Sequence, residues 1–316
     1  MTFFDTFLIS VFLKVATRLL TILKIKYIIK QIKYFATKNN CVLNAVQGFT
    51  DMNDSIKKQA TKYPVILVHG IMLRELKYFK AFGKIEKTLK NEGFEVFTAN
   101  TDAFGTIENN AEQLKEIIHG ILEECKAEKV NIIAHSKGGL DAKYMISSLD
   151  MADKVASFTS LCTPHRGSVI ATHIWHLPLF IKKCLAFFIN LFYKIIGDKN
   201  PDSLKVCEQL KEKDELEGEE CFSDRVYCQS YSTKIHKGTD CVLMAVPMAI
   251  YYKTRNEEND GVVSENSAKF EIYRGECIDE DISHTQIVDF FAKRKNRAKI
   301  LAFYTELCYE LAEMGF

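Results

Sequence analysis

The sequence predicts an α/β fold with a mostly parallel central sheet, helices on both faces of the sheet, and a helical insertion. Short apolar runs rich in β-branched residues, such as 65–68 and 130–133, have the length of buried strands. Stretches with helical spacing of apolar residues, such as 108–125, lie between them. Strands joined through helices run parallel with crossover connections. With 316 residues, 47% of them hydrophobic, the chain can bury one large core.

The expected elements follow one another along most of the chain. The pattern predicts four strands, at 65–68, 93–97, 130–133 and 155–162. It predicts helices at 78–89, 108–125, 140–146, 287–291 and 300–314. The basic run 293–295 is expected to be a solvated joint between the last two helices.

The N-terminal segment differs from the rest in composition. Residues 1–35 are dense in apolar side chains yet carry six basic residues, too many for an ordinary membrane span. We interpret them as a basic amphipathic helix that lies on a membrane surface or forms a short anchor. An atypical or uncleaved signal, and a helix packed on the protein's own core, stay open as alternatives. Asp5 precedes the apolar stretch and the positive charges follow it, which is no convincing cleavable signal peptide.

The charge balance bears on the binding partners, and the cysteines bear on the cellular compartment. The formal net charge is +1, so nothing in the charge balance indicates a nucleic-acid partner. The ten cysteines are scattered without the spacing of a zinc site, which favours buried free thiols and a reducing compartment. Residues 36–60 are polar and are expected to form a linker to a main domain at 61–316.

Because residues 1–35 are interpreted as a membrane contact, the sequence predicts membrane association. It leaves open on which side of the membrane the protein lies.

The most informative stretch is 130–139, in which a strand runs directly into a helix at Ser136. Such a sharp turn exposes the serine hydroxyl and demands small neighbours, a need that Ala134, Gly138 and Gly139 meet. The helix that follows points its N-terminal N–H groups at a developing oxyanion. A merely polar turn between strand and helix is the alternative. We interpret Ser136 as a nucleophile.

Three segments together carry a resemblance to a known family. They read YPVILVHGI at 63–71, AHSKGG at 134–139 and TPHRGS at 163–168. In this order and spacing they resemble the bacterial triacylglycerol lipases of the α/β-hydrolase superfamily. The resemblance covers about residues 63–290 and says nothing of the N-terminal segment. It implies an α/β-hydrolase fold and an ester-cleaving catalytic domain.

The resemblance also implies the remaining site residues. In this fold the triad follows the order Ser, Asp, His along the chain, which excludes His69 as the base. His284 is the only histidine that follows all the plausible acids, and Asp260 resembles the acid that the family places before a glycine. A simple turn at Asp260 and a loop role for His284 are the alternatives. The backbone N–H groups of Ile71 and Lys137 match the family's oxyanion hole.

A strongly apolar segment follows the third motif. Residues 173–197 fall where lipases of this type carry a lid helix, whose apolar face covers the serine and opens onto lipid. An ordinary core helix is the alternative. The segment belongs to an insertion expected at about 170–224, of which 198–224 is charged and expected to be solvated.

No cofactor or metal ion is expected. Some lipases of this type hold structural calcium partly through an aspartate two residues after the catalytic histidine, and that position is Gln286 here. Asp240 matches the other calcium aspartate, but a single carboxylate is weak support for a site.

The sequence thus predicts a serine carboxylester hydrolase, most simply a triacylglycerol lipase acting on acylglycerols at a lipid–water interface. An esterase or phospholipase with the same triad is an alternative of the same class. A catalytically idle lipid-binding or interaction module that keeps the fold is an alternative of another class.

Overall fold

The computed structural model describes residues 60–76, 79–212, 225–236 and 257–316. Lys58–Phe316 form one compact unit. The predicted helix at 1–35, the linker apart from residue 60, and Asp240 lie outside the described residues. Within the described ranges, no helix combines the length and the apolar character needed to cross a membrane.

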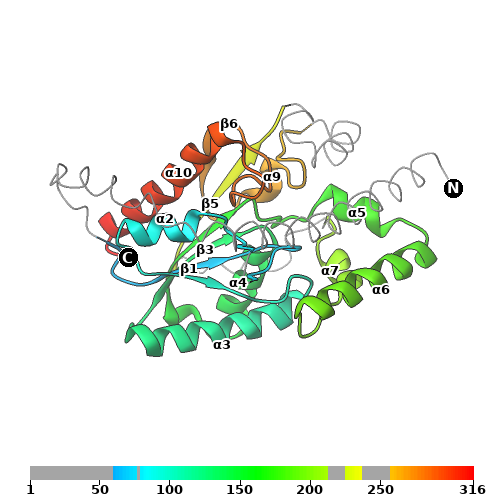
Figure 1. The fold of residues 1–316 in the computed structure, drawn as a ribbon, viewed down its shortest axis with the longest axis horizontal. Coiled ribbons are helices and arrows are strands. Elements are labelled where there is room, and N and C mark those ends of the chain that lie inside the picture. Colours follow the sequence, from blue (N-terminus) through cyan, green and yellow to red (C-terminus); the bar gives the residue numbers. More distant parts are fainter. Residues whose placement is uncertain (1–59, 77–78, 213–224, 237–256) are drawn as a thin grey trace, which may run out of the picture. The chain divides into compact units, whose positions relative to one another are not determined.

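The described residues form a six-stranded parallel sheet in the order β2-β1-β3-β4-β5-β6. This order confirms the predicted parallel sheet with crossovers (Figure 1). The strands are β1 (Val65–Val68), β2 (Val96–Ala99), β3 (Val130–His135), β4 (Val155–Leu161), β5 (Tyr227–Lys234) and β6 (Ile272–Asp281).

Helices cover both faces of this sheet (Figure 1). The helices that build the domain are α2 (Ile85–Asn91), α3 (Ile107–Cys125), α4 (Lys137–Ser148), α5 (Val169–Trp175), α6 (Leu179–Ile196), α7 (Ser203–Gln209), α9 (Glu265–Ala268) and α10 (Arg294–Glu313). A short 3₁₀ helix, Ala152–Lys154, precedes β4.

Alternate residues of β1 enter two separate cores, as the two-residue repeat of a strand requires. Val65 and Leu67 pack in the core that includes side chains of α2 and α10. Ile66 and Val68 pack in the core that includes side chains of α3 and α4. All four are fully buried, which explains why the sequence shows an unbroken apolar run there.

Three predictions about the helices are wrong. The helix predicted at 78–89 begins only at Ile85, because turns occupy 81–84. Residues 287–291 form turns rather than a helix, because Asp289 and Phe291 adopt left-handed backbone angles (φ 59° and 55°). The Asp289 carboxylate accepts hydrogen bonds from the Lys84 amide and from Arg297, and these contacts stabilise the turn. The expected joint at 293–295 is also wrong, since α10 already begins at Arg294.

Candidate active site

Ser136 stands between the end of β3 and the start of α4, at the turn that the sequence predicts. Its backbone adopts φ 55° and ψ −132°, a strained conformation that persists only where the surroundings enforce it. Gly138 permits the close approach of strand and helix, because a Cβ there would lie 2.4 Å from the carbonyl oxygen of His69. The local geometry is that of a nucleophile elbow.

The three residues predicted to form the triad come together in one hydrogen-bonded row. Nε2 of His284 lies 2.8 Å from Oγ of Ser136, and Nδ1 of His284 lies 2.7 Å from Oδ2 of Asp260. With Asp260 ionised, Nδ1 carries the proton, and Nε2 accepts the hydrogen bond from the serine hydroxyl. All three residues are buried.

The Asp260 carboxylate is held on its other side by the backbone. Its Oδ1 atom accepts hydrogen bonds from the amides of Val262 (2.9 Å) and Val263 (2.8 Å). The Asp260 carbonyl also accepts from the His284 amide at 3.0 Å. These contacts fix the carboxylate opposite the imidazole and stabilise its ionised form.

The fold explains why residues so distant in sequence meet. Ser136 follows β3, Asp260 lies in the segment between β5 and β6, and His284 follows β6. Because these strands are parallel, their carboxyl ends lie along one edge of the sheet. The predicted residues therefore converge at that edge.

The first motif lies beside the serine. Val68 of β1 pairs with Ala134 of β3, which brings Gly70 level with Ser136 two residues later. A Cβ atom on Gly70 would lie 2.6 Å from Cβ of Ser136, so only glycine fits. Ile71, whose amide is the expected partner of the Lys137 amide in an oxyanion hole, directly follows this contact.

His69 and His236 do not join the row. Burial lowers the pKa of His69 to about 4, and its Nδ1 atom donates to the carbonyl of Gly70, so the ring is neutral at pH 7. His236 is exposed and pairs with Asp281. His284 is thus the histidine that the structure places against Ser136.

Comparison with known proteins agrees with this geometry. Residues 58–235, more than half of the chain, match the family described as "Putative serine esterase (DUF676)". The chain belongs to this family. It is accordingly a carboxylic ester hydrolase of the serine esterase type.

Two similar proteins are triacylglycerol lipases. Triacylglycerol lipase 2 of Saccharomyces cerevisiae is 27% identical over 307 residues, covering 88% of this chain and 83% of the yeast protein. A triacylglycerol lipase of Pseudarthrobacter phenanthrenivorans is 32% identical over 154 residues, covering 45% of this chain and 47% of the relative. The match to the bacterial lipase therefore spans about half the length of either protein.

Solved structures share the fold. A metagenomic carboxyl esterase superposes with a TM-score of 0.61 at 17% identity, covering 86% of this chain and 82% of the other. The mature lipase BlEst2 of Bacillus licheniformis gives a TM-score of 0.52 at 17% identity, covering 77% and 96%. These likenesses confirm the α/β-hydrolase fold expected from the motifs.

His135 is a neighbour of the esterase site that the sequence argument missed. Its Nε2 atom donates to the carbonyl oxygen of His284 at 2.9 Å, and the two rings lie 4.6 Å apart. Burial holds the pKa of His135 well below its usual value. The only available signal was its place beside Ser136 in the motif.

One mixed set of side chains has the donors to hold a metal ion. The ligand atoms of Cys162, Asp260 and His284 lie within 4.8 Å of one another, and all three residues are buried. A thiolate, a carboxylate and an imidazole suit zinc rather than calcium. Such an ion would take the place of the proton between His284 and Asp260. Gln286, at the expected calcium position, accepts instead from the Ser283 amide.

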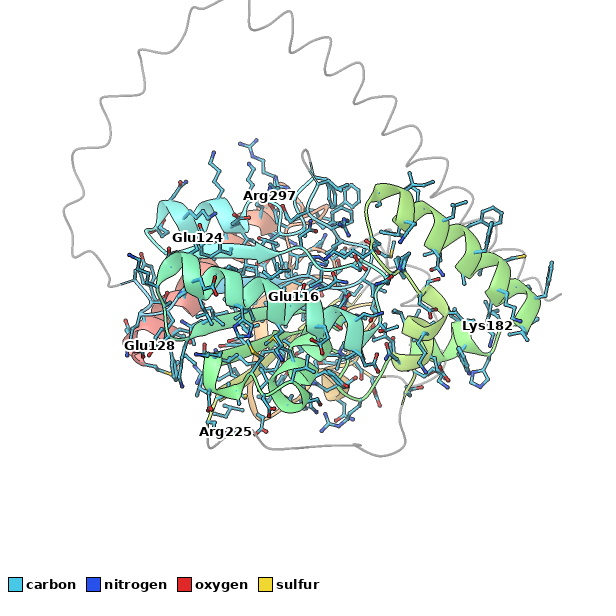
Figure 2. The ribbon with its side chains drawn as sticks, turned by 90° about the horizontal axis from the view of Figure 1, so that it is seen from below. Glu116, Glu124, Glu128, Lys182, Arg225 and Arg297 are labelled. Atoms are coloured by element: carbon cyan, nitrogen blue, oxygen red, sulfur yellow. The ribbon has the colours of Figure 1, made fainter. Side chains whose placement is uncertain are left out.

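Helix α6 presents its apolar side chains to solvent. None of its residues is buried, and Phe180 (77%), Phe187 (62%) and Ile195 (75%) are largely exposed. The ordinary core helix, kept open above, is therefore wrong for this segment. Lys182 lies on α6 in the part of the unit built by α5, α6 and α7, and Glu124 and Glu128 lie at the opposite end (Figure 2).

The segment after α6 is solvated only in part. Lys199, Asn200 and Lys205 are exposed, as the sequence predicts. Asp198 is 2% exposed, forms a 2.6 Å ion pair with Arg74, and accepts hydrogen bonds from the amides of Ala103 and Phe104. The prediction of a solvated insertion is therefore wrong for Asp198 and for the buried side of α7, and 213–224 lie outside the described residues.

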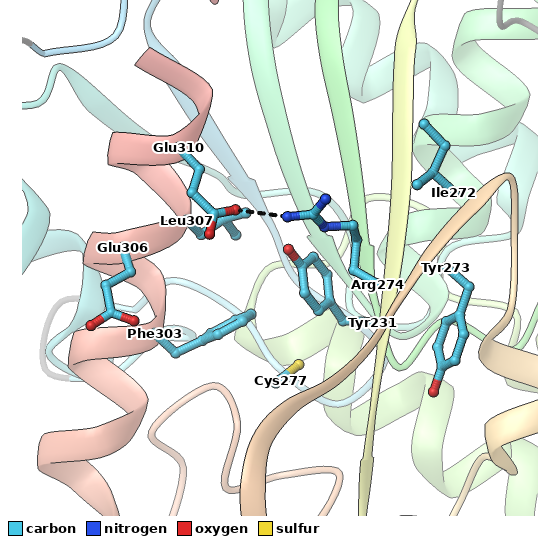
Figure 3. A pocket seen from close by; sticks show the side chains of 9 residues that line it. All are labelled: Tyr231, Ile272, Tyr273, Arg274, Cys277, Phe303, Glu306, Leu307 and Glu310. Atoms are coloured by element: carbon cyan, nitrogen blue, oxygen red, sulfur yellow. Dashed lines mark hydrogen bonds and ion pairs between the residues drawn. The ribbon is translucent and has the colours of Figure 1, made fainter. Parts of the chain in front are cut away.

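One hollow of the described residues lies away from this site. It measures about 540 Å³ and lies between the last two strands and α10, where Arg274 pairs with Glu310 beside Tyr231 (Figure 3). Neither Ser136 nor His284 lines it. The chemistry is therefore located by the hydrogen bonds between Ser136, His284 and Asp260.

Proposed function

We propose that the protein is a triacylglycerol lipase that cleaves esters with Ser136, His284 and Asp260 at a lipid–water interface. The observation that carries this proposal is the row of hydrogen bonds of 2.8 Å and 2.7 Å through the imidazole of His284. Its support in sequence is the set of lipase relatives, one of which matches nearly the whole chain.

In this mechanism, His284 takes the proton from Ser136 as the serine oxygen attacks the ester carbonyl. The imidazolium then gives the proton to the departing alcohol, leaving an acyl group on Ser136. Water, activated by the same imidazole, releases the fatty acid and restores the serine. Asp260 keeps Nδ1 protonated and stabilises the imidazolium without itself taking the proton.

Backbone N–H groups stabilise the tetrahedral oxyanion in this proposal. The amide of Lys137 opens helix α4 directly after the nucleophile, where the helix dipole favours negative charge. The amide of Ile71 is proposed as the second donor, because Ile71 directly follows Gly70, which lies against Ser136. Such donors act because they are already oriented when charge develops.

The proposed lid is the segment 173–197, which contains α6. The exposed apolar side chains of α6 form a surface that water disfavours and that lipid would cover. The helix carries Lys182, Lys183 and Lys194 and no acidic residue. Residues 1–35 are proposed as a second membrane-surface contact on the basis of their composition, joined by the linker 36–60 to a catalytic domain at 61–316.

The test is hydrolysis of p-nitrophenyl esters from short to long acyl chains, by wild type and Ser136→Ala side by side, with and without detergent. Serine-dependent turnover that persists on long chains and rises at the lipid interface supports a lipase. Turnover confined to short soluble esters would reassign the protein to an esterase. Turnover by Ser136→Ala would show that Ser136 is not the nucleophile.

A further inference from the structure

The residue after the nucleophile forms a buried ion pair. Nζ of Lys137 donates to Oδ1 of Asp141 at 2.6 Å, and each side chain is 1% exposed. The two residues lie one turn apart on α4. A lysine in the first helical turn opposes the helix dipole, so this position is unfavourable for a cation that has no partner.

The second oxygen of the carboxylate is also held. Nδ2 of Asn110, on α3, donates to Oδ2 of Asp141 at 3.0 Å and to the carbonyl oxygen of Asp102 at 2.9 Å. A Cβ atom on Gly105 would lie 2.1 Å from Oδ1 of Asn110, so this amide is closely confined. The ion pair is thereby fixed to a second helix and to the loop beyond β2.

Stability alone does not account for this arrangement. Removing two charges from water is costly, and an apolar pair of similar volume is often as stable as a buried ion pair or more so. What the contacts add is directional, because the ion pair ties the first turn of α4 to the second turn and Asn110 ties Asp141 to α3.

We propose that Lys137 and Asp141 are positioning residues, which hold the Lys137 amide at the place where the oxyanion develops. This inference rests on the proposed function, since it assigns a purpose to the oxyanion hole of that same site. Neither side chain touches substrate. A displacement of the amide by a fraction of an ångström weakens transition-state stabilisation while leaving substrate binding unchanged.

The test compares Lys137→Met, Asp141→Leu and the double variant. Each single variant leaves one buried charge unpaired and is expected to lower Tm by on the order of 10 °C. The double variant is expected to recover most of that Tm. Its kcat on a short p-nitrophenyl ester is expected to stay about 10- to 100-fold below wild type, with KM unchanged.

A boronic acid inhibitor provides an independent readout. Boronic acids form a tetrahedral adduct with the serine oxygen, so their affinity reports on the oxyanion hole without a leaving group. The double variant is expected to bind the inhibitor more weakly by about the same factor as kcat falls. The matched control is the exposed pair Lys90 and Glu86 on α2, which has the same spacing and a 2.7 Å contact. Lys90→Met with Glu86→Leu is expected to leave kcat and inhibitor affinity unchanged.

Wild-type kcat and inhibitor affinity in the double variant would overturn the proposal and make the pair purely structural. If that variant does not fold, Asn110→Ala removes one contact to Asp141 and leaves the ion pair in place. It is expected to lower kcat without raising KM, and an unchanged kcat would equally overturn the proposal. Ser136→Ala distinguishes failure of this inference from failure of the proposed function. An active Ser136→Ala enzyme would overturn the proposed function, whatever the role of Lys137 and Asp141.

Discussion

Nε2 of His284 lies 2.8 Å from Oγ of Ser136, although 148 positions separate the two residues in the chain. The contact is made because β3 and β6 end at the same edge of a parallel sheet. Asp260 approaches the opposite nitrogen of the imidazole, and its second oxygen is already taken by two backbone amides. The imidazole of His284 therefore lies between the serine hydroxyl and a carboxylate that the backbone holds in place.

Changes to the acid and the base are expected to abolish most turnover without unfolding the protein. Asp260→Asn favours the wrong imidazole tautomer and is expected to lower kcat by about 10⁴-fold, and His284→Gln by at least as much. Initial rates on a short ester, with circular dichroism as the check on folding, measure this. Asp281→Asn, at the exposed partner of His236, is the control and is expected to keep wild-type rates. A fully active Asp260→Asn would exclude that carboxylate from the mechanism.

The hydrogen bond from His135 to the carbonyl of His284 is expected to matter for rate rather than binding. His135→Phe keeps a flat ring beside the imidazole but loses the donor, so kcat is expected to fall about 10-fold with little change in KM. His165→Phe is the matched control, because His165 is a half-buried histidine whose ring stacks on Phe270 and hydrogen-bonds the Ser160 side chain. Equal effects of the two changes would mean that His135 acts only through core packing.

Acid is expected to destabilise the fold through its buried histidines. Burial lowers the pKa of His69 to about 4 and holds the pKa values of His135 and His165 well below their usual range. Below pH 6.5 the unfolded chain binds protons that the folded chain does not, so stability falls as pH falls. For His69 the loss amounts to about 2 kcal/mol at pH 5.

Urea unfolding between pH 8 and pH 5 measures this loss. The slope of stability against pH is expected to be shallower in His165→Phe than in wild type, since that variant lacks one of the three buried rings. Identical slopes would show that His165 titrates in the folded state as it does in the unfolded chain.

The single tryptophan reports on the apolar surface of α6. Trp175 ends α5, and the ammonium groups of Lys182 and Lys211 lie 4.0 Å and 4.5 Å from its ring centroid. Brominated lipids in vesicles are expected to quench its fluorescence, and Phe187→Glu is expected to reduce the quenching several-fold. Vesicle binding without any quenching would contradict contact at α6 and leave residues outside the described ranges to carry it.

Much of the fold could be predicted because β1, β3 and β4 are buried on both faces and therefore read as apolar runs. Strand β5 gives no such signal. Its buried Gln229 and Ser230 are satisfied by the Thr159 side chain and the Phe270 carbonyl, partners that the local sequence does not reveal. Strand β5 is therefore polar in sequence, although it is paired on both sides, with β4 and β6.

The candidate site likewise contains residues that the sequence could predict and residues that it could not. Ser136 and His284 could be predicted because the elbow needs small neighbours and the chain order selects the last histidine. The buried side chains of Lys137 and Asp198 could not, since lysine and aspartate are ordinarily solvated. Asp198 is buried because Arg74 and two backbone amides, about 95 to 124 positions away, provide its hydrogen bonds.

Covalent labelling with a fluorophosphonate tests most directly whether Ser136 is the nucleophile, because this reagent reacts with a serine activated by a neighbouring base. Intact-mass and peptide mass spectrometry of the labelled full chain identify the modified residue. One adduct is expected, on Ser136, which forms in step with the loss of esterase activity and is absent from Ser136→Ala. An adduct on another residue, or an active enzyme in which Ser136 stays unlabelled, would contradict it.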